Sequence, residues 1–215
     1  MINIFNQIIP PVAESVNITP NEAILLTESQ DASSIHNHDL LYAPFEQIQH
    51  QFFPAGSFIP RVTDGAEITS DPTEYAINGI NLDEAAYDNS VDEACQITCS
   101  LDRWDGGTIK VKVACSSASG TGTAVFEVNG RAYISGDNID QAFGTAQTCT
   151  ATISSANQIT DSTVSNAITI AGNPINGAIV QLQILRNGGT LAEDSKVQGV
   201  WIEWITLSTA ETAWS

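Results

Sequence analysis

Two histidines separated by one residue are the first side chains in the chain that could do chemistry together. His36 and His38 stand in the segment His-Asn-His-Asp, and alternate side chains on an extended backbone point the same way. If three copies met on a common axis, six imidazoles would surround it, enough to coordinate a transition metal octahedrally. The alternative is that both histidines hydrogen-bond locally while Asp39 and Tyr42 shape a structural collar. The spacing is therefore compatible with two interpretations, an axial metal site at His36 and His38 or a structural collar.

Carboxylates that could support glycoside hydrolysis occur in two short turns. Asp102 with Asp105, and Asp137 with Asp140, could form the flanking pair that this reaction requires. Aspartates in turns, however, mostly accept hydrogen bonds from nearby backbone. No G-x-S-x-G or H-E-x-x-H pattern is present, and no histidine occurs between residues 57 and 207, which removes the commonest general base. We therefore expect no enzymatic activity.

A further group of residues is suited to binding. Shallow sugar sites combine aromatic rings, on which sugars stack, with Asp or Asn side chains that bind hydroxyl groups, and loops carry their specificity. Residues of these types fall at predicted strand ends or in turns, and we take them as the candidate ligand-binding set: Trp104, Asp105, Tyr133, Asp137 and Asn138. Trp104 is more typical of a residue that closes the edge of a hydrophobic core than of a ligand platform.

The charge balance excludes several classes of partner. The net charge is −18, from 25 acidic residues against 7 lysines and arginines. Phosphate binding needs clustered cations, so we expect no nucleic acid and no anionic membrane surface as partner. The apolar runs are far shorter than the ~20 residues of a membrane-spanning helix. No Lys or Arg precedes Arg61, so a secretory signal is not expected either.

All four cysteines occupy alternate positions within predicted strands. Cys95 and Cys99 share a face with Ile97, and Cys115 and Cys149 are placed in the same way in later runs. Free cysteine is among the most buried residue types. The pattern therefore favours reduced core thiols over disulfides, in keeping with assembly in a reducing cytosol, and no second ligand pair follows at the spacing of a zinc site.

From residue 57 onward the sequence consists of short alternating runs separated by Gly, Asn, Asp and Ser turns. Strands are predicted near 57–62, 74–79, 94–101, 108–115, 122–134, 146–153, 166–170, 178–186 and 197–206. Asn129-Gly130 is either a hairpin turn or a bulge inside one long strand. This pattern predicts an all-β fold, an antiparallel jelly-roll β-sandwich over residues 57–207.

The first 56 residues differ in composition. Residues 1–30 carry three prolines among short apolar clusters and are expected to form an extended anchoring arm that docks onto another protein. Residues 31–56 are expected to form the collar and a linker. A short helix is predicted there after Pro44, because apolar residues recur at helical spacing at Phe45, Ile48 and Phe52. Residues 208–215 are a C-terminal tail.

The final predicted strand is apolar on both faces. Val200, Ile202 and Trp204 form one face, whereas Trp201 and Ile205 lie on the other. A two-sided apolar strand in a sandwich needs a cover on its outer face. Either the N-terminal segment or a neighbouring subunit would supply that cover, so Trp201 and Ile205 are predicted to lie at a subunit interface.

Two stretches resemble proteins of bacteriophage virions. His36-Asn-His-Asp-Leu-Leu-Tyr42, followed by Glu46, resembles the H-x-H-D-x-x-Y-x-x-x-E motif of trimeric tail-fibre and virion fibre proteins. The order of runs from Trp104 to Ile205, including Gly-Thr-Ile-Lys-Val-Lys-Val and Gly-Val-Trp-Ile-Glu-Trp, is similar to a jelly-roll module at the C-terminus of phage tail-fibre and other virion-associated proteins. A Gly-Gly pair stands where that module commonly has an aspartate-rich turn.

The resemblance implies a structural virion protein, namely a homotrimeric fibre or spike. Its N-terminus would be anchored to capsid or tail proteins, its jelly roll would be displayed for attachment to a host surface glycan, and an axial iron occurs at the H-x-H motif of some members. A capsid decoration or cement protein that stabilises the head is the alternative of the same kind. An alternative of another class is a glycan-binding module with no virion role. The expected location is the virion, assembled in the host cytoplasm.

Overall fold

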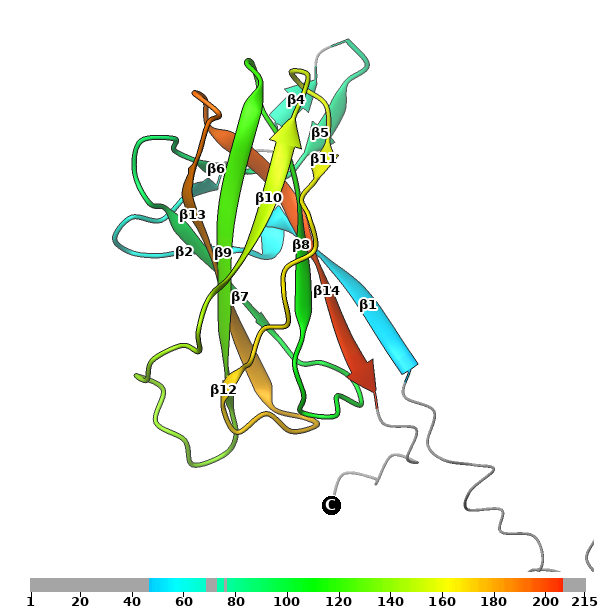
Figure 1. Cartoon of the computed structure of the whole chain (residues 1–215), viewed down its shortest axis with the longest axis vertical. Helices are drawn as coiled ribbons and strands as arrows, with labels where there is room; N and C mark the ends of the chain where they lie inside the picture. Colours follow the sequence, from blue (N-terminus) through cyan, green and yellow to red (C-terminus); the bar gives the residue numbers. More distant parts are fainter. Residues whose placement is uncertain (1–46, 69–72, 76, 207–215) are drawn as a thin grey trace, which may run out of the picture. The chain divides into compact units, whose positions relative to one another are not determined.

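Two β-sheets packed face to face make up the described part of the chain (Figure 1). A computed structural model describes residues 47–68, 73–75 and 77–206, which lie within the compact unit Pro44–Ser215. All but one of the strand pairings recorded there are antiparallel. The predicted jelly-roll β-sandwich is therefore confirmed. The predicted arm at 1–30, most of the collar segment and the tail at 208–215 lie outside the described residues.

The first sheet, sheet A, is built around a long central strand near the end of the chain. Its order is β11 (Thr160–Asp161), β8 (Lys110–Ser116), β14 (Ser195–Thr206), β6 (Ala85–Tyr87) and β3 (Glu67–Ile68), and β1 (Gln47–Pro54) also pairs with β14. Strand β14 is long enough to pair with β6 along its first residues and with β1 along the rest. Figure 1 shows β1 beside β14 at the edge of this sheet.

The second sheet, sheet B, faces sheet A across the core. Its order is β10 (Gln147–Ile153), β9 (Gly122–Tyr133), β13 (Ile179–Gly189), β7 (Ala94–Cys99) and β2 (Ile59–Pro60), with the short β12 (Ala171–Gly172) parallel to β9. The remaining described elements are the hairpin of β4 (Thr73–Tyr75) and β5 (Ile80–Leu82) and the 3-10 turn η2 (Ala55–Ser57). No helix among the described residues is long and apolar enough to cross a membrane.

The core follows the period-two pattern of the sequence. Val180, Leu182 and Ile184 of β13 are fully buried, while the glutamines between them are only partly buried, as alternation on a strand requires. Asn129-Gly130 forms no hairpin turn, because β9 runs through it without interruption. A Cβ at Gly130 would lie 2.5 Å from Leu182 Cδ2, so glycine is the residue that lets the core close over β9.

Residues 47–54 form strand β1, so the prediction of a short helix after Pro44 is wrong for these residues. An isolated helix of two turns is marginal in water, whereas β1 pairs with β14 at eight consecutive positions, from Gln47 opposite Thr206 to Pro54 opposite Gly199. A Cβ at Gly199 would collide with the Phe52 ring, so this glycine permits the pairing. Strand β1 thus joins sheet A ahead of the predicted boundary at residue 57.

Other predicted strands are confirmed with shifted ends or are much reduced. The runs predicted at 94–101, 108–115, 122–134, 146–153, 178–186 and 197–206 correspond to β7, β8, β9, β10, β13 and β14. The run at 57–62 retains only the two residues of β2, and the run at 74–79 turns after Tyr75. The run at 166–170 contributes an isolated bridge between Ile109 and Ile168 instead of a strand.

The four cysteines are free thiols, and three of them are fully buried. Cys99 is partly buried and packs against the core, so the prediction of core thiols is confirmed. Burial is the main cause that raises the pKa of each thiol, to about 11 for Cys95 and to about 12 for Cys99 and Cys115. An ionised thiolate in an apolar core loses its hydration, so these cysteines are poor nucleophiles in the folded chain.

Because the Cys115 thiol is buried, we expect the free energy of unfolding to fall in alkali. The ordinary pKa of 9.0 rises to about 12 in the folded chain, so between these values the unfolded chain releases a proton that the folded chain keeps. Stability is fully present below pH 9 and falls by about 1.4 kcal/mol per pH unit for this thiol above it. Urea unfolding at pH 9, 10 and 11 should show a steeper fall for the native chain than for Cys115→Ala. Equal slopes would contradict the assignment.

Candidate functional site

On the outer face of sheet A, exposed side chains from three neighbouring strands contact one another. Strand β14 turns Trp201, Glu203 and Ile205 outward. Their antiparallel partners on β1 and β8 lie on the same face, as directly opposed residues do. We call this surface the Trp201 face and define it by Ile48, His50, Phe52, Lys110, Lys112, Trp201, Glu203 and Ile205.

Trp201 is held in place and yet remains open to solvent. Its side chain is 40% exposed, and the ring of Phe52 on β1 packs against it with centroids 5.0 Å apart and planes tilted by 50°. On the β8 side, the Lys112 ammonium lies 6.0 Å from the indole centroid, within the range of a cation–π contact. The neighbouring strands therefore fix the indole without covering it.

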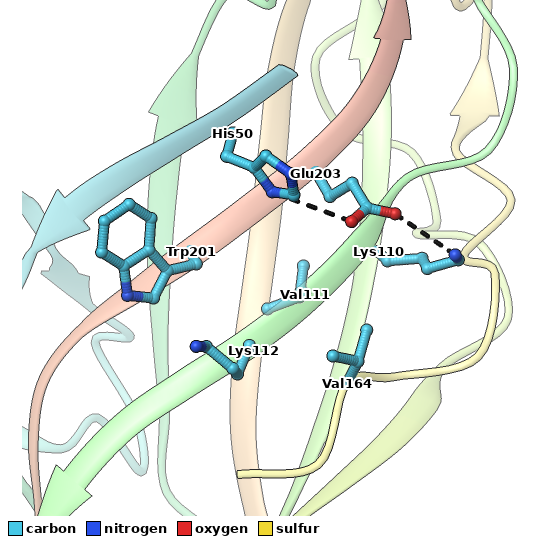
Figure 2. A pocket seen from close by; sticks show the side chains of 7 residues that line it. All are labelled: His50, Lys110, Val111, Lys112, Val164, Trp201 and Glu203. Atoms are coloured by element: carbon cyan, nitrogen blue, oxygen red, sulfur yellow. Dashed lines mark ion pairs between the residues drawn. The ribbon is translucent and has the colours of Figure 1, made fainter. Parts of the chain in front are cut away.

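Both lysines of the Trp201 face form ion pairs with carboxylates. Lys110 Nζ lies 3.2 Å from Glu203 Oε1 and His50 Nδ1 lies 3.7 Å from Glu203 Oε2, while Lys112 Nζ lies 2.6 Å from Asp161 Oδ2. Figure 2 shows the first two pairs meeting at Glu203. Pairs this exposed contribute about 0–1 kcal/mol each to stability. Their main effect is to fix where the charges of this face lie.

Two hollows open on this face, one on either side of Trp201. The first has a volume of 290 Å³ and is lined by His50, Lys110, Val111, Lys112, Val164, Trp201 and Glu203 (Figure 2). The second, of 430 Å³, is lined by Phe52, Pro54, Asn81, Leu82, Asp83, Ala114, Ile159, Asp161, Gln198 and Trp201. The second begins further along β1, β8 and β14 than the first, so the two form one groove that runs along the strands. We call it the Trp201 groove.

The wall of the groove opposite β1 is the segment 159–165, which is fixed to β8 by serine side chains. Ser165 Oγ accepts a hydrogen bond of 3.0 Å from Val111 N, and Ser162 Oγ accepts one of 2.9 Å from Val113 N. The backbone N–H groups of both serines donate in turn to the carbonyls of the same two valines. Such reciprocal bonding holds Ile159, Asp161 and Val164 in position beside the groove.

A buried polar network lies beneath the second hollow. The Glu84 side chain is 2% exposed and forms an ion pair of 3.0 Å with Lys196. Gln198, which lines the hollow, donates to Glu84 Oε1 at 2.9 Å and to Ser116 Oγ at 2.8 Å. The Tyr75 hydroxyl also donates to Glu84, at 2.6 Å; burial first, and then this carboxylate, raises the pKa of Tyr75. The network fixes the amide of Gln198 at the floor of the groove.

Replacing Glu84 by glutamine should destabilise the chain by about 2 kcal/mol. The change leaves the Lys196 ammonium beside a neutral amide, and removing one member of a buried pair costs several kcal/mol. We expect less than the full amount, because Lys196 is 24% exposed. The measurement is the urea midpoint of unfolding. Glu203→Gln is the matched control, since its pairs are exposed and its loss should stay below about 1 kcal/mol; equal losses for the two variants would refute the network.

The residues predicted to bind ligand lie in the connection between β7 and β8, at the end of β9 and in the loop that follows β9. Most of them act as turn formers there. Asp137 Oδ2 accepts from Ile134 N at 2.9 Å, Asn138 Oδ1 accepts from Asp140 N at 3.1 Å, and Asp105 Oδ1 accepts from Gly107 N at 2.7 Å. The Tyr133 hydroxyl donates to Ile139 O at 2.9 Å. Neither hollow of the Trp201 groove includes any of these residues.

Trp104 is a core residue, which corrects its place in the predicted ligand-binding set. Its side chain is 1% exposed and belongs to the main hydrophobic cluster, so no sugar could stack on it. A bridge to Thr206 fixes its backbone at the end of β14. The sequence leaves this outcome open, since tryptophan after a turn suits either a ligand platform or the closure of a core edge.

Strand β1 pairs edge to edge with β14 and so widens sheet A, and its side chains lie beside Trp201 and Ile205 without covering the outer face of β14. Ile205 is opposite Ile48 and Trp201 is opposite Phe52, and the subunit interface at Trp201 and Ile205 stays a prediction. The predicted collar and metal residues lie outside the described part of the chain: His36, His38, Asp39 and Tyr42. Within the described part, no group of three or more His, Cys, Asp or Glu side chains is arranged to hold a metal ion.

Comparisons with known proteins yield only weak structural likenesses. No family model and no curated protein matches the chain. The CBM22-1–GH10 modules of a Clostridium thermocellum endo-1,4-β-D-xylanase, solved with xylohexaose, give a TM-score of 0.43 at 17% identity, over 77% of this chain and 29% of that one. A family 11 carbohydrate-binding module from Clostridium thermocellum, solved with a β-1,3-1,4-mixed-linked tetrasaccharide, gives 0.36 at 13% identity, over 76% and 98%.

An isomalto-dextranase of Arthrobacter globiformis, solved with panose, gives a TM-score of 0.39 at 11% identity, over 71% of this chain and 23% of that one. This chain thus spans less than a third of the xylanase and dextranase chains. The sugars are ligands of those proteins. Because all three scores lie below 0.5, we base the proposed function on the geometry of the Trp201 groove itself.

Proposed function

We propose that this chain is a carbohydrate-binding β-sandwich that holds its ligand in the Trp201 groove. The observation that carries the proposal is the placement of Trp201, 40% exposed and lining both hollows. The apolar face of a sugar ring stacks on an aromatic ring of this kind, because both surfaces leave water when they meet. The groove therefore has a central platform on which a sugar ring can rest.

Polar side chains around the platform are suited to sugar hydroxyl groups. The second hollow presents the carboxylates of Asp83 and Asp161 and the amide of Asn81, whereas the amide of Gln198 is engaged by Glu84 and Ser116 beneath it. Carboxylates accept hydrogen bonds, while amides both donate and accept. Hydroxyl groups need both kinds of partner, and the apolar walls at Leu82 and Ile159 supply contact area between them. Such a mixture of apolar lining and few polar groups is typical of ligand sites.

The groove is built on paired strands, which favours binding with little ordering of the protein. Phe52 and Lys112 hold the indole of Trp201, and the network around Glu84 holds Gln198. A ligand that meets fixed side chains loses less free energy to ordering than one that must immobilise a loop. Binding without cleavage is the proposed activity, because the carboxylates of Glu203 and Asp161 are engaged in ion pairs with lysine ammonium groups.

The resemblance to phage virion proteins supports a second proposal, which concerns the setting of the module. The H-x-H-D-x-x-Y-x-x-x-E pattern ends at residue 46, immediately before β1. A trimeric collar at that pattern would tether three carbohydrate-binding modules in one attachment protein, and linked weak sites bind a surface far more tightly than one site does. Mass photometry of the full chain tests this directly. A trimer of about three times 22.9 kDa is expected, and a monomer at all concentrations would overturn it.

The carbohydrate proposal is tested by screening the full chain on an array of host-surface and plant-type glycans, followed by calorimetry on every hit. We expect at least one oligosaccharide to bind with a Kd between about 1 mM and 1 μM, the range of a shallow groove with one aromatic platform. Silence of the whole array, confirmed by calorimetry on folded protein, would overturn the proposed function. In that case a capsid decoration role would become the favoured one, and cryo-EM of the particle would locate the chain on the head.

A further inference from the structure

We propose that the ligand of the Trp201 groove is an uncharged, extended oligosaccharide that occupies both hollows at once, and that the groove rejects anionic sugars. This inference rests on the proposed function and specifies its ligand. Two observations carry it, namely the shape of the groove and the pairing of its charges.

The groove is elongated. From Glu203 at the first hollow to Gln198 at the second, its floor follows six residues of β14, and the distance from the first to the last is about 17 Å at the rise of an antiparallel strand. Phe52 and Pro54 on β1 form one wall of the second hollow, and Ile159 and Asp161 form the other. A single sugar would fill only part of this length. A linear chain lying along β8 and β14 would contact Trp201 near its middle and polar groups on both sides.

The charges of the groove leave no cation for an anionic sugar. The two hollows contain two lysines and three carboxylates in their linings. Lys110 is paired with Glu203 and Lys112 with Asp161, and Asp83 adds a further negative charge to the second hollow. A bound uronate or sialate would compete with these carboxylates for the lysines. The net charge of −18 over the whole chain adds a repulsive field at long range.

Neutral sugars meet no such opposition. Their hydroxyl groups can donate to Asp83 and Asp161 and accept from Asn81, and their apolar faces can lie on Trp201. Since the ligand carries no charge, its affinity should change little with salt, whereas screening would relieve part of the repulsion felt by an anionic sugar. The Lys112–Asp161 pair is thus a specificity determinant. Removing its carboxylate frees a lysine beside the platform.

The test uses calorimetry on the full chain with matched ligands. Hexaoses of glucose, mannose and galactose are compared with hexauronates of the same linkage, and each neutral sugar is also measured as its disaccharide. We expect a neutral hexaose to bind at least tenfold more tightly than its disaccharide and at least tenfold more tightly than its hexauronate. A hexauronate that binds as tightly as its neutral partner, and loses that binding in Trp201→Ala, would overturn this inference and leave the proposed function standing. Absence of binding to all of them would count against the proposed function itself.

A charge variant sharpens the test by predicting a gain. Asp161→Asn should raise hexauronate affinity at least threefold relative to neutral hexaose affinity at low salt, because Lys112 loses its partner while the amide oxygen can still accept from a sugar hydroxyl group. Asp140→Asn is the matched control, since it makes the same charge change in the exposed loop after β9 and should alter neither affinity. An equal gain in both variants would show that overall charge alone sets the preference and would overturn the role of the pair.

Discussion

Replacing Trp201 by alanine is expected to weaken carbohydrate binding by about 2 kcal/mol, which is roughly thirtyfold in Kd. The indole is the element shared by both hollows, so its loss removes the stacking platform and leaves two shallow depressions joined by a gap. Aromatic residues at the centre of a binding surface typically account for losses of this size. Calorimetry with the best neutral hexaose measures the change.

Two control variants separate loss of the platform from loss of the fold. Trp201→Phe keeps an aromatic ring and should retain part of the affinity. Ile179→Ala removes a side chain that is 56% exposed on β13 of sheet B and should leave binding unchanged. Because 40% of Trp201 is already exposed, the urea midpoint of Trp201→Ala should fall only slightly. Undiminished affinity in Trp201→Ala would remove the indole from the site.

The second large effect concerns Arg186, whose side chain is almost fully buried in the described structure. Its Nη1 donates to Tyr87 O at 2.8 Å and to Glu193 O at 3.1 Å, and its Nη2 donates to Leu191 O at 3.1 Å. Burial lowers the pKa of Arg186, and the nearby acidic residues oppose that shift. Arginine nevertheless stays charged near neutral pH. The guanidinium therefore joins strand β6 of sheet A to the connection between β13 and β14.

Arg186→Met is expected to lower the free energy of unfolding by about 3 kcal/mol or more. The variant fills similar space but leaves two buried carbonyl groups and one partly buried carbonyl group without the guanidinium donor, and each charge-assisted hydrogen bond is worth about 1.5–3 kcal/mol without being additive. Urea unfolding followed by fluorescence gives the value. Arg61→Met, at an exposed position, is the matched control and should change stability by less than about 0.5 kcal/mol. A loss of less than 1 kcal/mol in Arg186→Met would contradict this account.

The fold class could be predicted because each strand is marked by a pattern of neighbouring residues in the sequence. Alternation along β13, with Val180, Leu182 and Ile184 on one side, is visible within seven residues, and turn residues mark the ends of most strands. Cysteine burial follows from the same periodicity. Register and pairing order were not predictable, because they depend on contacts between strands far apart in the sequence. The spacing of Ile48 and Phe52 is helical, but both residues are extended because β1 pairs with β14, about 150 residues further along the chain. The local sequence does not indicate that pairing.

Of the residues that line the Trp201 groove, only Trp201 was singled out from the sequence. Trp201 was identified from its place on the outer face of an apolar strand, although as an interface residue. Phe52, Lys112 and Asp161 join it only through pairings of β1, β8 and β11, which no local pattern reveals. In contrast, the turn aspartates that suggested a ligand site bind their own backbone. Residues that look polar and exposed in sequence are often engaged by their own turn, and a groove exists only after the sheet has formed.

The central claim is that a sugar contacts the Trp201 indole, and an NMR titration of the indole N–H groups tests it most directly. Trp204 donates its indole N–H to Asp102 O at 3.0 Å and is buried, so its resonance serves as an internal control, and the Trp201→Phe variant assigns the Trp201 resonance. Adding a neutral hexaose should shift the Trp201 resonance progressively to saturation while that of Trp204 stays in place. Saturable binding by calorimetry with an unmoved Trp201 resonance would place the ligand elsewhere and contradict the account.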